Sequence, residues 1–513
     1  MIFDSYEAFR AVNFTAKVCI LGSGPAGTTI ARKLGVAGIP VVVLEAGSRE
    51  FSDDSQDFYR GATVGDPYFD LDITRLRFMG GSSNHWAGWC RVLDSQDFEP
   101  KAWAPDTGWP ISRADIEPYL PEVHDILELP DFRPDVPISD DIRWVQLIKS
   151  PAVRFGEKFA DELDKSRNVA VVLNTYATEL AGDGKRVTGA KLWSNGQDAG
   201  SFTADYFIVC TGGLENSRLL LWSNQRSNGG VVPKATALGS YWMEHPTFEG
   251  GNAILADYSA FEVDATNEAF FSPTLAAMER LEIMNFGIRL IETPYPGVKR
   301  VIADLACTAP EMAEWVSYQL SQDLRCAAQL YVTWEQAPLA SNRIQLSKAD
   351  VDHAGVPRIE LHWKKSELER RTLLEGLRLF GTTLVQKDLG RVRIADWLTN
   401  GGDYPTNEEL AGHHHMGGTR MGTDVIKSVV DANSKVHGMD NLYVGGSSVF
   451  CTSGECNPTT TIVALACRLG DHLSKVIGVQ KAGSAGRPRD RHRSPPPTTP
   501  APVGYERPSL PSV

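Results

Sequence analysis

The C-terminal part of the chain carries residues that can move a proton. Three consecutive histidines, His413, His414 and His415, lie in the segment GHHHMGGTRMG, and Asn457 lies in GECNPTTT. A histidine changes its charge near neutral pH and serves as a general base. An asparagine amide both donates and accepts hydrogen bonds. Residues of these types are able to remove a proton and to orient a polar group.

Plainer interpretations compete with a chemical role. The histidines could bind a metal or be satisfied within a loop, but Asp424 and Cys451 alone do not complete a metal-ligand set, so we predict no metal. Asn457 before Pro458 is also a good helix start, with Asn as N-cap and Pro as first helical residue. Both interpretations of Asn457 are compatible, because the backbone can begin a helix while the side chain faces a substrate.

A fourth histidine lies in an unusual loop. Residues 79–88 read MGGSSNHWAG, so His85 and Trp86 follow two glycines and two serines. Neither a surface turn, which does not need the tryptophan, nor a buried core segment, which does not favour two glycines and an asparagine, explains this combination. One interpretation is a histidine that hydrogen-bonds to backbone at a domain or subunit contact.

The element that must position these residues lies at residues 16–47. There Gly22-x-Gly24-x-x-Gly27 follows an apolar strand and opens a helix, and Glu45 ends the next apolar strand. This is the context of a dinucleotide-binding unit, in which the helix N-terminus faces a pyrophosphate and the acidic residue binds ribose hydroxyls. FAD and NAD remain undistinguished by this motif, and the alternative is an ordinary tight turn.

Composition limits the class of protein. The chain has 513 residues, 42% of them hydrophobic, and a net charge of −13, which disfavours nucleic acid. We expect no membrane insertion, because no apolar run is long enough to span a bilayer. The N-terminus MIFDSYEAFR does not resemble a secretory signal. The eight scattered cysteines are interpreted as reduced, mostly buried thiols, so we expect a cytoplasmic protein.

The rest of the chain shows four kinds of pattern. Residues 205–223 indicate a buried strand, Gly-Gly and a helix, whereas alternating apolar segments between about 236 and 364 predict an antiparallel sheet with one covered face. Residues 366–385 predict an amphipathic helix opened by a capping box. The last 33 residues are rich in Pro, Ser and Arg and are predicted to be disordered.

Taken together, these motifs resemble those of the glucose–methanol–choline (GMC) flavin oxidoreductases. The resemblance rests on GSGPAG with Glu45, GGSSNHWAG, CTGGLENSRLLL, SNRIQLS…GVPRIELHW, HHMGGTRMG and NLYVGGSSVFCTSGECNPTTTIVALA, and it covers nearly the whole ordered chain. The sugar oxidases of the pyranose oxidase type look most similar, because they also carry a His-Trp pair after Gly-Gly. The resemblance implies FAD rather than NAD.

The family also implies a fold and its division into domains. The expected fold is α/β, an FAD-binding Rossmann-like domain with an inserted antiparallel-sheet substrate domain. Residues 1–235 and 365–480 would form the FAD-binding domain, residues 236–364 the substrate-binding domain and residues 481–513 a disordered tail.

The resemblance assigns roles residue by residue. The histidine four positions before the threonine of HMGGT matches the family's catalytic base, which is His415 here, and Asn457 matches the second polar residue; His414 is the alternative base. In pyranose oxidase-like enzymes the histidine of a Thr-His-Trp motif bonds to the flavin. Here Asn84 precedes His85, so FAD held without a covalent bond stays open. The predicted cofactor-binding residues are Gly22, Gly24, Ala26, Gly27, Glu45, Gly80, Gly81, Asn84, His85, Trp86, Ala87, Gly212, Gly446, Pro458 and Thr459.

The implied activity is FAD-dependent oxidation of a CH–OH group in a sugar, glycoside or polyol, with dioxygen or a quinone as electron acceptor. Two alternatives remain: a hydroxynitrile lyase-type enzyme without net redox chemistry, and a dehydrogenase that passes electrons to a quinone or a partner protein. A non-catalytic flavoprotein is disfavoured because both His415 and Asn457 are present. A homo-oligomer is compatible with the sequence.

Overall fold

The apolar runs around the glycine-rich turn become strands of one parallel sheet. The computed structural model describes residues 1–234, 236–256, 261, 268–293, 295, 297–320, 326–405, 409 and 412–484. The strand order is β1 (Ile2–Phe3), β9 (Val169–Val172), β3 (Val41–Leu44), β2 (Val18–Leu21), β13 (Tyr206–Val209) and β21 (Leu442–Val444). Every residue of the four central strands is buried, which explains why their sequences are continuously apolar.

The second large sheet is antiparallel throughout. Its strands follow the order β20 (Gly390–Ile394), β14 (Thr247–Leu255), β17 (Ala328–Trp334), β16 (Phe286–Glu292), β15 (Glu268–Pro273), β7 (Ile142–Val145) and β6 (Val136–Pro137). Four of these strands come from the predicted 236–364 segment. The others, β6, β7 and β20, come from outside it, so the boundaries at 236 and 364 remain a prediction that does not enclose the whole sheet.

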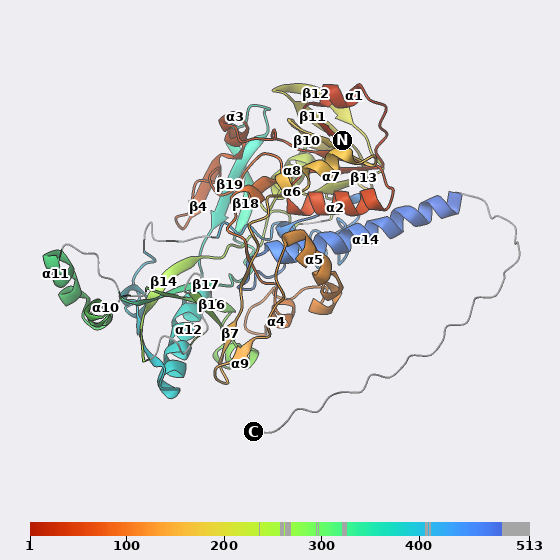
Figure 1. The fold of residues 1–513 in the computed structure, drawn as a ribbon. Coiled ribbons are helices and arrows are strands. Elements are labelled where there is room, and N and C mark those ends of the chain that lie inside the picture. Colours follow the sequence, from red (N-terminus) through yellow and green to blue (C-terminus); the bar gives the residue numbers. More distant parts are fainter. Residues whose placement is uncertain are drawn as a thin grey trace, which may run out of the picture. The chain divides into compact units, whose positions relative to one another are not determined.

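A long helix covers one face of this sheet. Helix α12 (Glu367–Gln386) begins at the predicted capping box, in which Ser366 Oγ accepts from Glu369 N and the Glu369 carboxylate accepts from Ser366 N. Its buried side chains Leu377 and Phe380 pack with Phe286 and Trp334 of the sheet, and Figure 1 shows the helix beside β16 and β17. The amphipathic helix predicted at 366–385 is therefore confirmed.

Smaller elements connect these layers. The three-stranded sheets are β10 (Thr175–Gly182), β11 (Val187–Ser194) and β12 (Gln197–Phe202), and β18 (Arg343–Val351), β19 (Pro357–Trp363) and β4 (Gly61–Gly65); β5 (Trp89–Cys90) pairs with β8 (Ile148–Lys149). The remaining helices are α1 (Tyr6–Arg10), α2 (Pro25–Val36), α3 (Asp53–Gln56), α4 (Ser95–Phe98), α5 (Leu120–Leu127), α6 (Phe155–Lys158), α7 (Ala160–Lys165), α8 (Glu215–Arg226), α9 (Leu275–Leu281), α10 (Val298–Thr308), α11 (Pro310–Leu320), α13 (Asp396–Thr399) and α14 (Thr459–Ser484).

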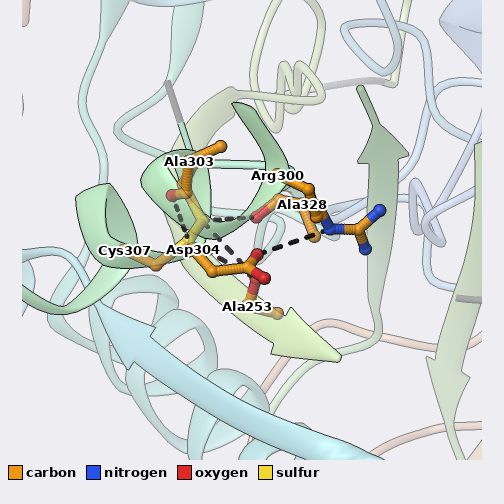
Figure 2. The surroundings of a disulfide bond; sticks show 7 residues. Ala253, Arg300, Ala303, Asp304, Cys307 and Ala328 are labelled. Carbon is orange, nitrogen blue, oxygen red and sulfur yellow. Dashed lines mark hydrogen bonds and ion pairs between the residues drawn. A yellow bond between two sulfur atoms is a disulfide. The ribbon is translucent and has the colours of Figure 1, made fainter. Parts of the chain in front are cut away.

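Two cysteines correct the prediction that all eight are reduced. Cys307, near the end of α10, forms a disulfide with Cys326, just before β17 (Figure 2). Their Cα atoms lie 4.8 Å apart although 19 positions separate them in sequence. Helix α11 lies between the two cysteines in sequence. The spacing of the cysteines in the sequence does not indicate that they pair. The other six cysteines are free and buried, as predicted.

The chain divides into two units, Met1–Ser474 and Lys475–Val513. In the second unit the described residues, up to Ser484, are helical. The predicted disordered tail is 481–513. Its first four residues are described and belong to α14, and the rest of it, from 485 onward, lies outside the described residues.

Candidate active site

A large cavity lies between the parallel sheet and the antiparallel sheet. Its volume is about 790 Å³. At one end it is lined by the turns that follow β2, β3 and β13, and at the other by side chains of β14, β16 and β17. The carboxyl ends of parallel strands are where α/β folds bind nucleotides.

The glycine-rich turn after β2 leaves an open cradle in this cavity. Gly22 has φ of 97°, a conformation that favours glycine. A methyl group on Gly27 would lie 2.0 Å from the carbonyl oxygen of Gly22, so Gly27 permits close packing of α2 on the turn. A methyl group on Gly24, by contrast, would meet no protein atom within 4 Å. Gly24 therefore borders empty space at the N-terminus of α2, where a phosphate fits.

Glu45 is fixed beside this cradle. One carboxylate oxygen accepts hydrogen bonds from Ser23 N and Ser23 Oγ at 2.9 and 2.6 Å, and the other accepts from Gly47 N at 2.9 Å. Each oxygen has further lone-pair capacity, and Glu45 lines the cavity. The buried carboxylate can therefore accept hydrogen bonds from sugar hydroxyls.

The loop at 79–88 is tied to the same turn. Gly80 N donates to Ser23 Oγ at 3.1 Å, and Trp86 Nε1 donates to Val153 O at 3.0 Å. Asn84 Nδ2 donates to Met79 O at 2.9 Å and so closes its own loop. His85 lines the cavity with its side chain exposed there and without a protein hydrogen bond among the described residues. Burial lowers the pKa of His85, so the ring is neutral at neutral pH.

The three consecutive histidines line the cavity but have three different partners. The His413 ring meets Phe69 edge-on at 4.9 Å, His414 Nδ1 lies 2.9 Å from His245 Nδ1, and His415 Nε2 lies 3.2 Å from Tyr68 Oη. Burial is the main cause of a lowered pKa in each of the three. All three rings are therefore neutral at neutral pH, which is the form that accepts a proton.

Asn457 lies on the wall of the same cavity. Its half-buried side chain has no hydrogen-bond partner among the described residues. Helix α14 begins at Thr459, so Pro458 precedes its first residue, and both of these residues line the cavity. The amide of Asn457 is thus available to a bound molecule.

The structure brings most of the predicted residues together. Those that line the cavity are His414, His415, Asn457, Gly22, Gly24, Ala26, Glu45, Gly81, His85, Trp86, Ala87, Gly212, Gly446, Pro458 and Thr459. The residues Gly27, Gly80 and Asn84 do not line it. They shape the turns instead, since a methyl group on Gly80 would lie 2.5 Å from Gly156 N and the Asn84 amide bonds to Met79.

Sequence reasoning missed three polar residues behind the histidines: Tyr68, Glu244 and His245. Glu244 and His245 are fully buried. The one signal in the sequence is an adjacent acid and histidine within the otherwise apolar segment YWMEHP. Nothing in that signal connects residue 244 with residue 414.

The other end of the cavity is rich in hydroxyl-binding groups. Thr247 Oγ1 lies 2.7 Å from Thr333 Oγ1, and Arg289 Nε donates to Glu268 at 3.0 Å. Glu455 lines this end, and its pKa is raised by burial. Trp89 lines the same end.

Comparison with known proteins agrees with this geometry. Residues 338–466 match the GMC oxidoreductase family. This part of the chain is similar to the GMC oxidoreductases. The large subunit of fructose dehydrogenase from Gluconobacter japonicus is 24% identical over 59% of this chain and 53% of that protein, so the match spans about half its length.

Other matches extend the comparison. 2-Methyl-1,2-propanediol dehydrogenase from Mycolicibacterium austroafricanum is 23% identical over 89% of this chain and 95% of that protein. Pyranose 2-oxidase from Tricholoma matsutake is 46% identical over 66 residues, 13% of this chain and 12% of that protein. The structure of pyridoxine 4-oxidase from Mesorbium loti superposes with a TM-score of 0.57 at 16% identity, over 89% of this chain and 99% of that one. This likeness confirms the predicted fold class.

FAD is the cofactor of this family, and the cavity fits it. The open space at Gly24 and the fixed carboxylate of Glu45 match a phosphate and a ribose. The His85 ring and the Asn457 amide, which have no hydrogen-bond partner among the described residues, match a polar ring system. No described helix has the length and apolar character needed to span a bilayer.

Proposed function

We propose that the protein oxidises a CH–OH group of a sugar, glycoside or polyol in an FAD-dependent reaction. The supporting observation is the convergence of distant segments on one cavity. The dinucleotide cradle of residues 22–26, His85, His415 and Asn457 all line it. The alternative assignment of the base, His414, lines the same cavity.

The chain's own residues would hold and deprotonate the alcohol. FAD bound in the cradle would supply the acceptor for the hydride that leaves the carbinol carbon. His415 is neutral and would accept the hydroxyl proton, and the Asn457 amide would orient the hydroxyl oxygen. The N-terminal end of α14, beside Pro458, would favour negative charge that develops nearby.

Further residues that line the cavity support the class of substrate that we propose. Thr247, Thr333 and Glu455 offer donors and acceptors to several hydroxyl groups, and Trp89 offers an apolar face to carbon-bound hydrogens. A polyhydroxylated substrate uses both kinds of contact. The names of two relatives, fructose dehydrogenase and 2-methyl-1,2-propanediol dehydrogenase, are consistent with such a substrate.

A screen for flavin bleaching tests the proposal. The protein is mixed under nitrogen with a panel of alcohols that includes fructose and 2-methyl-1,2-propanediol, and the absorbance of the flavin at about 450 nm is followed. Loss of the yellow colour with an alcohol supports oxidation, whereas turnover of a hydroxynitrile without bleaching supports a lyase. Rapid recolouring in air indicates dioxygen as the acceptor, and slow recolouring indicates a quinone or a partner protein.

A further inference from the structure

A buried carboxylate connects the candidate bases. Glu244 is completely buried, and its Oε1 accepts hydrogen bonds from the backbone N–H groups of His245 and His414 at 2.8 and 2.6 Å. Its Oε2 is hydrogen-bonded to the Tyr68 hydroxyl, whose oxygen in turn faces His415 Nε2 at 3.2 Å. One carboxylate thus holds the backbone of one candidate base and, through Tyr68, the side chain of the other.

We propose that Glu244 and Tyr68 are positioning residues that decide which ring nitrogen of His415 carries a proton. The predicted effect on the reaction rate rests on the proposed function, whereas the predicted tautomer of His415 does not. A tyrosine hydroxyl has one proton. When Glu244 is ionised, that proton is donated to the carboxylate, so the Tyr68 oxygen can only accept from His415 Nε2–H. The lone pair of His415 is then on Nδ1, the ring nitrogen that has no hydrogen bond among the described residues.

Protonation of Glu244 reverses this arrangement. Both backbone N–H groups point at Oε1, so an added proton belongs on Oε2, where it donates to the Tyr68 oxygen. The Tyr68 proton then turns to His415 Nε2, and His415 carries its own proton on Nδ1. In that state the ring nitrogen that is not bonded to Tyr68, Nδ1, has no lone pair and cannot act as a base.

A parallel contact fixes the tautomer of His414. His245 Nε2 faces two carbonyl oxygens, Gly454 O at 2.8 Å and Ser453 O at 3.2 Å, so it carries a proton. His245 Nδ1 is then an acceptor, and His414 Nδ1, which lies 2.9 Å away, is the donor. His414 therefore has its lone pair on Nε2 at every pH where both rings are neutral.

Burial and the surrounding charges set the pH range in which Glu244 ionises. Burial raises the pKa of Glu244 to about 7, opposed by the hydrogen bonds from Tyr68 and the two backbone N–H groups and reinforced by Glu409. Glu409 is paired with Lys365 at 3.2 Å. Arg75 is the cation that acts on both Tyr68 and His415. Glu244 is therefore protonated below about pH 7 and ionised above it.

Glu244→Gln imitates the protonated state. The two backbone N–H groups require the amide oxygen at the Oε1 position, so the NH₂ group occupies the Oε2 position and donates to Tyr68 at every pH. With fructose or 2-methyl-1,2-propanediol, whichever bleaches the flavin, kcat/KM of the wild type should rise through about pH 7. The Glu244→Gln variant should lose this rise and be at least about tenfold slower than the wild type at about pH 8.5.

Two further variants separate positioning from loss of structure. Tyr68→Phe keeps the ring but cuts the link, so it should also lose the rise while retaining bound FAD. Glu369→Gln is the matched control, because Glu369 is equally buried and its pKa is also raised to about 7, but among the described residues it has no hydrogen bond with Tyr68 or the histidines. Its link to Glu244 runs through Gln336, whose Oε1 accepts from the Glu244 backbone N–H and not from its carboxylate. This control should keep the rise. Retention of the rise in both Glu244→Gln and Tyr68→Phe would overturn the proposal.

A spectroscopic readout keeps the inference testable without turnover. In the holoenzyme labelled with nitrogen-15 histidine, the signals lost in His415→Gln identify His415, which should change tautomer between about pH 6 and about pH 8.5. The change should be absent in Glu244→Gln. A tautomer of His415 that stays fixed in the wild type would overturn the proposal, whereas correct tautomers without bleaching by any alcohol would count against the proposed function alone.

Discussion

His245 and His414 share a hydrogen bond between their Nδ1 atoms, which lie 2.9 Å apart. Burial lowers the pKa of His245 to about 4 and that of His414 well below its ordinary value. Two neutral imidazoles can form this bond only if one donates and the other accepts. Because backbone carbonyl oxygens engage His245 Nε2, the direction of the bond is set by residues 453 and 454, far from the triple histidine in sequence.

The assignment of the base predicts different effects for neighbouring histidines. His415→Ala should retain FAD and lower kcat by roughly two to four orders of magnitude, because loss of a general base has that effect. His414→Ala should have a smaller effect. The measurement is the rate of flavin bleaching under nitrogen, normalised to bound FAD. Near-normal rates in His415→Ala, with a large loss in His414→Ala, would transfer the role to His414.

The cradle predicts a variant that folds but does not bind the cofactor. Gly24 has φ of −66°, which suits any residue, and a methyl group there meets no protein atom within 4 Å. Gly24→Ala should therefore unfold at the same temperature as the wild-type protein without FAD, yet bind FAD more weakly. Gly478→Ala, where a methyl group also meets nothing within 4 Å, is the control. Equal FAD content in the two variants would contradict the placement of the pyrophosphate at this turn.

The resemblance that places His85 beside the flavin gives a direct test of a covalent bond. If that bond exists, acid-precipitated protein stays yellow, and His85→Ala releases all of its colour into the supernatant. Absorbance of pellet and supernatant measures the outcome. Complete release from the wild-type protein means that FAD is held without a bond to His85, the alternative that Asn84 leaves open.

Glu369 predicts a pH-dependent difference in stability. Its carboxyl group ionises near 4.5 when unfolded, but burial raises its pKa to about 7 in the folded protein. The folded state thus retains a proton that the unfolded chain has lost, and stability falls as pH rises through 7. Glu369→Gln avoids this loss. Between about pH 5 and about pH 8, its free energy of unfolding relative to wild type should rise by up to about 3 kcal/mol. Denaturant titrations at both pH values measure this, and a constant difference would contradict it.

The disulfide predicts sensitivity to thiols. It closes a loop between residues 19 positions apart. Loss of a link of that size removes at most about 3 kcal/mol of stability. Cys307→Ser and reductant-treated wild type should therefore unfold at the same lowered temperature. If reductant lowers the temperature of Cys307→Ser as well, another thiol is responsible.

Local patterns predicted the parallel sheet and the cofactor cradle, because Gly22, Gly27 and Glu45 act within one strand–helix–strand unit. They also predicted the capping box at Ser366 and the matched positions of His415 and Asn457 in the cavity. In contrast, the contacts of Tyr68 and Glu244 with the histidines join residues about 350 and 170 positions apart, respectively. Such contacts are decided by tertiary packing and carry no local signal.

A tertiary contact also affects the prediction of cellular location. That prediction took all eight cysteines as thiols, whereas α10 and α11 bring Cys307 to Cys326. Cytoplasmic location therefore loses the argument from the cysteines and stays a prediction.

Cys307, Cys326 and the chain between them form a covalent ring that contains α11. A protease that cuts α11 would therefore release neither fragment. The nicked protein would migrate as one band on a denaturing gel without reductant and as two bands with it. In a glutathione-rich cytosol the ring would open, so the migration of protein taken directly from its native cells reports the redox state in which it matured.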